Sequence, residues 1–392
     1  MNKSIKKAVT KAEKQNKTEI RKNIVFSFFA GAGFLDLGFE TSGYEIAFVN
    51  ELNKSFLNAY RFSRTKMKMS KPRYGFYEGD MADLTKGSGR KKLTNYINDA
   101  RKQDALIGFI GGPPCPDFSI AGKNRGREGR HGKLSSTYIS LISQQKPDFF
   151  LFENVKGLWR TKSHRIFYEE LKATLQKHGY VLIERLINAL EYGVPQDRDR
   201  IILVGFRSEL IPLDFLDPDK KNLLKSEVFP WESFIKYPRE KIFPKLKKVE
   251  KMYDNVLSKR PAGIPVDTMV EYWFNKNKVN LHPNAKHYFV PRALLRFKNT
   301  REGDVSRKSF KRLHRWRYSP TVAYGNNEVH LHPYEARRLS VAEALSIQSL
   351  PKQFILPDTM TLSDMFKAIS NGVPYVAAEA VANTIKTFLN TL

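Results

Sequence analysis

Along residues 23–206, short apolar runs alternate with longer amphipathic stretches, a pattern that predicts strands separated by helices. Short apolar runs that end in small or polar residues predict buried strands, and they are NIVFSFF, YEIAFVNEL, GFYEGD, DALIGFI, PDFFLFENV, YVLIERLINAL and RIILVGF. Stretches between them, such as RIFYEELKATLQKHG, repeat apolar residues with the period of a helix. This alternation predicts the α/β class, with a parallel sheet that carries helices on both faces.

The pattern changes along the chain, and the changes predict four parts. Residues 1–22 form a basic N-terminal arm, and residues 23–206 form the main domain. Residues 207–330 lose the alternation and gain scattered prolines, and residues 208–330 hold 25 Lys/Arg against 14 Asp/Glu, which predicts a smaller basic domain. Residues 331–392 return to helix-forming sequence, and the final VPYVAAEAVANTIKTFL predicts an amphipathic helix that docks back on the sheet.

Composition narrows the class of protein. No run approaches the roughly 18 apolar residues of a membrane span, and the basic N-terminus lacks the apolar core of a secretory signal. A single cysteine excludes an intrachain disulfide and a multi-cysteine zinc site, so we expect a reducing cytoplasm and no metal. The formal net charge of +27 favours a polyanionic partner such as nucleic acid, although a solvated basic surface has the same composition. Nothing in the sequence demands more than a monomer.

Three predicted strand ends carry groups that suit an adenosine. FAGAGFLD places Gly31 and Gly33 where the first strand turns into a helix, so that a ligand can approach the backbone closely. Glu51 ends the second strand, where a carboxylate can accept from both ribose hydroxyls, and Asp80 ends the third, where it can accept from an adenine amino group. Asp36 stands where the dinucleotide fingerprint needs a third glycine, which argues against NAD and for S-adenosylmethionine. Taken alone, Gly-x-Gly also fits an ordinary tight turn.

The next strand ends carry reactive groups. Cys115 follows the fourth strand in GGPPCPDFS, and Glu153 and Asn154 end the fifth in FENVKG. Arg198 and Arg200 are two residues apart in QDRDR, so on a strand they share one face. A thiol, an acid and two arginines suit nucleophilic attack on an electron-poor ring. Each feature also has a structural explanation: a buried cysteine, a helix cap and a salt-bridged strand.

The ordered set of motifs resembles bacterial-type DNA (cytosine-5) methyltransferases over most of the chain from Asn23 onward, apart from the middle basic domain. The resemblance implies a Rossmann-like S-adenosylmethionine-dependent methyltransferase sheet with a target-recognition domain at 207–330. It implies that Cys115 is the nucleophile and Glu153 the proton donor, with Asn154, Arg198 and Arg200 beside them. It implies cofactor contacts at Phe29, Gly31, Gly33, Glu51, Asp80, Met81, Pro114, Asn371 and Val373.

The loop after Cys115 is expected to assist DNA binding. Residues 116–133 carry five Lys/Arg and four glycines, which suits a mobile segment that closes over phosphates, although a disordered surface loop looks the same. Within it we predict DNA contacts at Ser119, Lys123, Arg125 and Arg127. A target base inside a duplex must be flipped out to reach the predicted nucleophile. The sequence does not reveal the recognised DNA word.

Five positions depart from the usual family pattern, and they are Phe34, Leu52, Pro116, Ser370 and Tyr375. None removes a nucleophile or a charge that the chemistry needs. Three rival functions remain open at this point. An RNA cytosine-5 methyltransferase has a similar architecture, a non-catalytic DNA-binding relative would lack some reactive residues, and an NAD oxidoreductase would need the third glycine. A restriction endonuclease that acts separately is the expected partner of a stand-alone enzyme of this kind.

Overall fold

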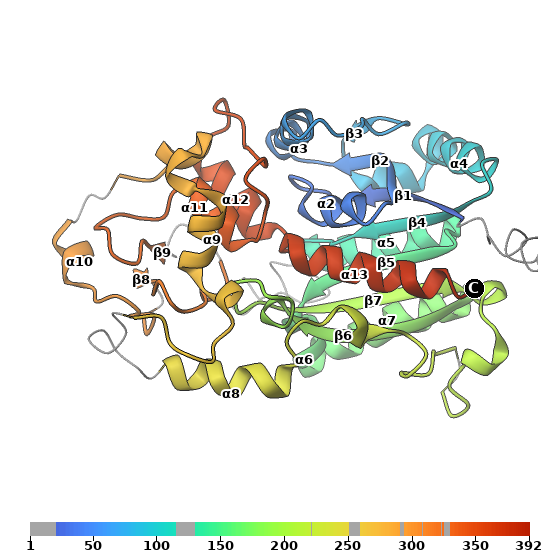
Figure 1. The fold of residues 1–392 in the computed structure, drawn as a ribbon. Coiled ribbons are helices and arrows are strands. Elements are labelled where there is room, and N and C mark those ends of the chain that lie inside the picture. Colours follow the sequence, from blue (N-terminus) through green and yellow to red (C-terminus); the bar gives the residue numbers. More distant parts are fainter. Residues whose placement is uncertain are drawn as a thin grey trace, which may run out of the picture.

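A seven-stranded sheet lies at the centre of the molecule (Figure 1). The computed structural model describes residues 21–114, 130–220, 222–250, 259–290, 294–307, 309–322, 324 and 330–392. The strands are β1 (Lys22–Phe28), β2 (Glu45–Glu51), β3 (Phe76–Glu78), β4 (Ala105–Gly111), β5 (Phe149–Val155), β6 (Tyr180–Asn188) and β7 (Asp199–Arg207). Their order across the sheet is β3-β2-β1-β4-β5-β7-β6. The order reverses at β1 and β4, as in doubly wound α/β folds.

One strand runs against the others, and the prediction of an all-parallel sheet is wrong there. β7 pairs antiparallel with both β5 and β6, whereas the pairs β1–β2, β1–β4, β2–β3 and β4–β5 are parallel. The cause is the short link of residues 189–198, which holds only the 3-10 turn η3 (Ala189–Tyr192). A parallel crossover needs a dozen or more residues and usually a helix, so the chain must turn back on itself.

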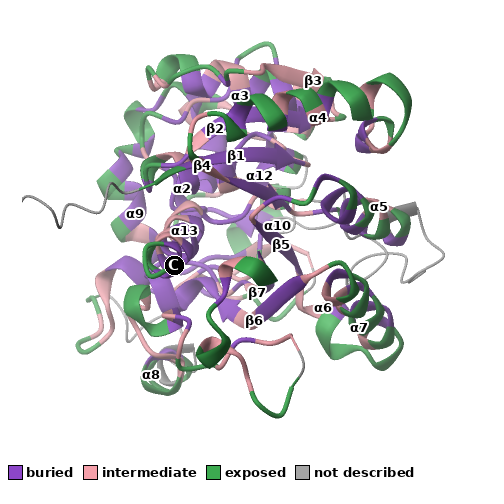
Figure 2. Cartoon of the chain, turned by 90° about the vertical axis from the view of Figure 1, so that its right-hand side faces the viewer, coloured by how far each residue is buried: buried purple, intermediate pink, exposed green. Residues whose placement is uncertain are grey.

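Helices cover both faces of the sheet. They are α2 (Phe34–Thr41), α3 (Lys54–Lys66), α4 (Gly87–Arg101), α5 (Arg130–Gln145), α6 (Lys156–Arg160), α7 (Lys162–Lys177) and the last helix, α13 (Tyr375–Leu389). Figure 2 shows the strands and the inner sides of the helices as buried, with exposed residues on the outer sides of α4 and α7. Among the described residues, no helix has the length and apolar character that a membrane span requires.

The strands are apolar on both faces, and each face of the sheet has its own hydrophobic core. Consecutive residues of a strand pack into opposite cores. Val25, Leu151 and Val204 pack with α2, α3 and α13, while their neighbours Phe26 and Leu203 pack with α4, α5 and α7. This is the period-two pattern of a sheet that is buried on both sides. It explains why the sequence shows continuous apolar runs instead of alternation.

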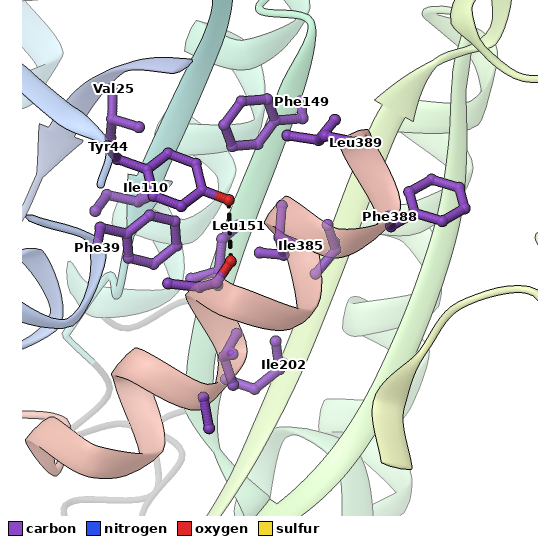
Figure 3. Packing of buried hydrophobic residues seen from close by; sticks show 14 of the residues in the cluster. Val25, Phe39, Tyr44, Ile110, Phe149, Leu151, Ile202, Ile385, Phe388 and Leu389 are labelled. Carbon is purple, nitrogen blue, oxygen red and sulfur yellow. Dashed lines mark hydrogen bonds between the residues drawn. The ribbon is translucent and has the colours of Figure 1, made fainter. Parts of the chain in front are cut away.

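The C-terminal helix α13 completes the first core. Figure 3 shows Ile385, Phe388 and Leu389 of α13 among side chains of the sheet and α2. The Tyr44 hydroxyl donates a hydrogen bond of 3.0 Å to the Ala382 carbonyl and fixes the helix along its axis. The C-terminal helix therefore packs in the same hydrophobic core as the first strands of the chain.

The remaining elements form a smaller unit beside the carboxyl edge of the sheet (Figure 1). They are α8 (Arg239–Glu250), α9 (Val270–Asn277), α10 (Leu294–Asn299), β8 (Lys311–Arg312), β9 (His330–Leu331), α11 (Val341–Ile347) and α12 (Leu362–Asn371). The residues that follow position 207 still pack with the sheet, because Leu224, Phe229 and Trp231 lie in its core. The smaller unit continues past residue 331, because α11 packs against Val270 and Phe274 of α9.

Candidate active site

The ends of β1, β2, β4 and β5 meet at one edge of the sheet, and the start of β7 joins them there. Antiparallel pairing sets Arg200 of β7 opposite Val155, at the last position of β5. Residues at the beginning of β7 consequently lie beside those at the end of β5. The sequence-predicted acid and arginines are thus brought together from segments about 45 residues apart (200 − 155).

Glu153 and Arg200 form an ion pair at this edge. Arg200 Nε lies 2.7 Å from Glu153 Oε1, and the two side chains are only 13% and 11% exposed. Arg200 Nη1 also donates to the carbonyl of Asp199, at 2.7 Å. The guanidinium is therefore held between a backbone oxygen and a nearly buried carboxylate, an arrangement that fixes both side chains.

Gly112 gives the Glu153 carboxylate its room, and sequence reasoning gave that glycine no role. A Cβ at Gly112 would lie 2.6 Å from Glu153 Oε2, closer than carbon and oxygen approach without contact strain. The absent side chain lets the carboxylate lie against the backbone of the turn after β4. Its position directly before Pro113, in GGPPC, is the signal that sequence reasoning had available.

Asn154 connects β5 to the same turn. Its amide Nδ2 donates to the Pro113 carbonyl at 3.5 Å, and its Oδ1 accepts from the Val155 N–H at 2.8 Å. Asn154 is 2% exposed, so it acts on the shape of the turn and is not open to solvent. Pro114 follows and is exposed. The predicted nucleophile Cys115 comes next and lies outside the described residues.

Arg198 is buried, in contrast to its neighbour Arg200. It is 2% exposed, and its guanidinium donates to Ser370 O at 2.9 Å, Val322 O at 3.4 Å and Gln196 Oε1 at 3.5 Å. Burial lowers the pKa of Arg198 well below its ordinary value, and the charge of Arg200 adds to that effect. This environment favours a role of Arg198 in supporting the site over direct contact with a phosphate.

Two glutamines extend this support to the end of α12, and sequence reasoning assigned neither of them a role. Gln348 Nε2 donates to the Ile369 carbonyl at 2.6 Å, and Gln196 Nε2 lies 3.3 Å from Gln348 Oε1. Asn371, the last residue of α12, is exposed, and Val373 is 8% exposed. The two predicted cofactor contacts thus follow a segment that is anchored to the start of β7.

The glycine turn after β1 has an open backbone. Phe29, Gly31 and Gly33 have φ values of 55°, 57° and 82°, which place all three in the left-handed region. Within the part of the chain that the structure describes, a Cβ at Gly31 would meet nothing within 4 Å, whereas one at Gly33 would lie 2.4 Å from the Tyr60 ring. Gly33 is therefore needed for packing, and Gly31 leaves space through which a ligand can reach the backbone.

Glu51 closes the other side of this turn. Its Oε2 accepts from the Gly31 N–H and its Oε1 from the Asn53 N–H, each at 2.8 Å. Burial raises the pKa of Glu51, and the two N–H donors oppose that shift. Each carboxylate oxygen accepts one of these bonds and keeps a lone pair for a further donor.

Asp80 and Met81 follow β3 at the same edge. The Asp80 carboxylate accepts from the Ala82 N–H at 2.9 Å and caps the 3-10 helix η1 (Met81–Thr85). Met81 is 1% exposed, and its side chain packs in the core. The structure thus places Asp80 next in line after Glu51, as the sequence predicts.

A buried charge cluster lies directly beneath the glycine turn. Arg64 donates to the Gly33 carbonyl and to Glu40 Oε2, each at 2.6 Å, and Asp36 Oδ1 accepts from Ser27 Oγ at 2.8 Å. Burial raises the pKa of Asp36 to about 6 and that of Glu40 to about 7, although Arg64 opposes both shifts. The Asp36 that replaces the third glycine therefore belongs to the support of the turn.

Some of the five positions that depart from the usual family pattern make specific contacts in the structure. Phe34 is buried against Gly372, where a Cβ would lie 2.1 Å from its ring, and it packs edge-on to Phe354. The Tyr375 hydroxyl donates to Glu379 Oε1 at 2.7 Å, and the Ser370 carbonyl accepts from Arg198. Leu52 is 55% exposed beside Glu51. Pro116 and the predicted DNA contacts Ser119, Lys123, Arg125 and Arg127 lie outside the described residues.

Comparisons with known proteins agree with this architecture. The family model described as C-5 cytosine-specific DNA methylase matches residues 24–387. The chain is 53% identical to the Type II methyltransferase M.NmeDI of Neisseria meningitidis serogroup C, over 95% of this chain and 85% of that one. It is 29% identical to the Type II methyltransferase M.FnuDI of Fusobacterium nucleatum, over 93% and 94%. The S. pombe Dnmt2 methyltransferase structure shares the fold, with a TM-score of 0.58 at 12% identity over 95% and 99%.

Proposed function

The chain belongs to the family of C-5 cytosine-specific DNA methylases, and on that premise we propose a specific reaction. The protein transfers a methyl group from S-adenosylmethionine to carbon 5 of a cytosine that is flipped out of a particular duplex DNA sequence. The similarity to two Type II methyltransferases supports a further assignment, as the modification enzyme of a restriction–modification system whose endonuclease is a separate protein.

The residues around the glycine turn fit the cofactor. The open side of Gly31 admits a ligand to the backbone, and the Glu51 carboxylate stands beside it with acceptor capacity to spare. Phe29 and Gly33 would shape the turn, Asp80 and the Met81 backbone would face the adenine, and Pro114, Asn371 and Val373 would close the pocket. When bound, S-adenosylmethionine supplies an electrophilic methyl group.

Carbon 5 of cytosine is a weak nucleophile and needs activation by the protein. The Cys115 thiolate adds to carbon 6, which breaks the aromaticity and moves electron density to carbon 5. Glu153, in its protonated form, donates a proton to ring N3 and stabilises the adduct, while Arg200 holds the base oxygen. After carbon 5 has taken the methyl group, its proton passes to a solvent-derived base, β-elimination releases the Cys115 thiolate, and N3 returns its proton to Glu153. Asn154 and Arg198 keep the turn and the start of β7 in place.

DNA recognition is assigned to two segments. The loop that contains Ser119, Lys123, Arg125 and Arg127 would contact phosphates around the flipped base. The basic region 207–330 would read base edges in the major groove, and its excess of Lys/Arg supports that role. The smaller unit lies next to the carboxyl edge of the sheet (Figure 1), and the Glu153–Arg200 pair belongs to strand ends at that same edge.

The observation that carries the proposal is the nearly buried Glu153–Arg200 pair beside the turn that leads to Cys115. Bisulfite sequencing of DNA from cells that express the protein should reveal 5-methylcytosine in one sequence context. Cys115→Ser should abolish it, and Glu153→Gln should slow single-turnover methyl transfer strongly. Methylation of transfer RNA in place of duplex DNA, or retained methylation by Cys115→Ser, would overturn the proposal.

A further inference from the structure

Asp199 lies between the two arginines of QDRDR, and its carboxylate collects contacts from three segments. Oδ2 is 2.5 Å from the Lys156 ammonium, and Oδ1 accepts from Asn188 Nδ2 at 3.0 Å and Arg239 Nη2 at 3.1 Å. Lys156 begins α6 directly after β5, Asn188 ends β6 and Arg239 begins α8. One side chain therefore joins the end of β5, the end of β6 and the first helix of the smaller unit.

The same residue is linked to the reactive pair through its backbone. Arg200 Nη1 donates to the Asp199 carbonyl, and Arg200 Nε contacts Glu153. Lys156 lies three residues after Glu153, directly beyond the end of β5. The Lys156–Asp199 contact therefore joins the segment that carries Glu153 to the segment that carries Arg200. It lies next to the Glu153–Arg200 ion pair along the two segments.

The electrostatics of Asp199 fit an ionised, firmly held group. Burial by itself would raise its pKa, but hydrogen bonds from Lys156 and Asn188 and the charges of Lys156 and Arg239 outweigh it, so the pKa lies below its ordinary value. The side chains of Asp199 and Lys156 are 17% and 32% exposed. The pair is thus more enclosed than the surface ion pairs that contribute little.

We propose that Asp199 and Lys156 are positioning residues for methyl transfer, which hold the start of β7 against the end of β5 so that Arg200 meets Glu153. The proposal rests on the functions assigned above to Glu153 and Arg200. Backbone pairing joins the two strands as far as Val155 and Arg200, and the Lys156–Asp199 contact is the side-chain link just beyond this last pair. A displacement of about 1 Å at such a group costs on the order of a hundredfold in rate.

The test compares variants of the full-length protein in single-turnover methyl transfer to duplex DNA. Asp199→Asn turns an amide toward the Lys156 ammonium, and we expect a rate about 10- to 100-fold lower, with the KM for S-adenosylmethionine and the Kd for DNA changed less than about twofold. Lys156→Met should match it, and Lys156→Arg should restore most of the rate because it keeps charge and donors. The double variant Asp199→Asn/Lys156→Met should be no slower than the slower single variant, since both act through one contact.

Glu184 provides a matched control away from the site. Its carboxylate joins β6 to α7, with Tyr168 Oη at 2.6 Å and Lys172 Nζ at 3.1 Å, and its side chain is 26% exposed. Glu184→Gln should lower the melting temperature as much as Asp199→Asn while leaving the rate unchanged. A wild-type rate in Asp199→Asn, or an equal loss in Glu184→Gln, would overturn the positioning role. Failure of the wild-type protein to methylate DNA would instead refute the proposed function.

Discussion

Replacing Gly112 by alanine tests whether the position of the Glu153 carboxylate sets the rate of methyl transfer. The new Cβ would lie 2.6 Å from Glu153 Oε2, whereas ordinary contacts begin at 3.4 Å, so the carboxylate must retreat by about 0.8 Å (3.4 − 2.6). Among the described residues, and apart from the chain neighbours of Gly112, no other atom comes closer than 3.7 Å. Gly112 is not in the left-handed region, so alanine can adopt its backbone conformation.

The structure separates the expected effect on stability from the effect on rate. The displaced atom is the end of a flexible side chain, so we expect unfolding to change by less than about 1 kcal/mol. The displaced group is also the proposed proton donor, and a shift of this size at a reacting group costs about a hundredfold in rate, equal to about 2.7 kcal/mol in the barrier. Gly112→Ala should therefore fold normally and methylate slowly.

The assay is single-turnover transfer of a labelled methyl group to duplex DNA, with S-adenosylhomocysteine binding by calorimetry as the check on the cofactor pocket. The double variant Gly112→Ala/Glu153→Gln supplies the decisive comparison, because both changes act on one carboxylate. We expect it to be no slower than Glu153→Gln alone. A wild-type rate for Gly112→Ala, or fully additive losses in the double variant, would refute the reasoning.

Two further predictions concern stability. Because burial raises the pKa of Asp36 from 3.8 to about 6 and that of Glu40 from 4.5 to about 7, their contribution to the free energy of unfolding should be complete only below these ordinary values. It should be lost as the pH rises through about 6 and about 7. From an ordinary pKa of 3.8, the share of Asp36 is about 3 kcal/mol. Urea unfolding from pH 5 to 8 should therefore show a slope that Asp36→Asn reduces, and an unchanged slope would contradict it. Tyr44→Phe should remove the hydrogen bond to Ala382 and cost about 1 kcal/mol of unfolding free energy, with no change in methylation rate per folded molecule; a slower rate would contradict it.

Residues that end predicted strands were located correctly because strand ends can be read from short apolar runs. Glu51, Asp80 and Glu153 all lie at the carboxyl edge for this reason. The partners of Arg198 could not be read in the same way. Val322 and Ser370 lie 124 and 172 residues away, and they contact the guanidinium through carbonyl oxygens that every residue possesses. No residue type marks such a contact, so the burial of Arg198 follows only from the tertiary fold.

The direction of β7 explains how the arginines reach the reactive edge at all. β7 is nine residues long, so its two ends are roughly 26 Å apart. In a parallel strand Arg200 would start at the amino edge, and its guanidinium could not span that distance to Glu153. The ten-residue link of residues 189–198 is too short for a crossover, and it therefore returns the chain at the edge where β6 ends. The same short link that breaks the parallel pattern delivers Arg198, Asp199 and Arg200 to the end of β5, which makes the reversal of β7 a requirement of the site.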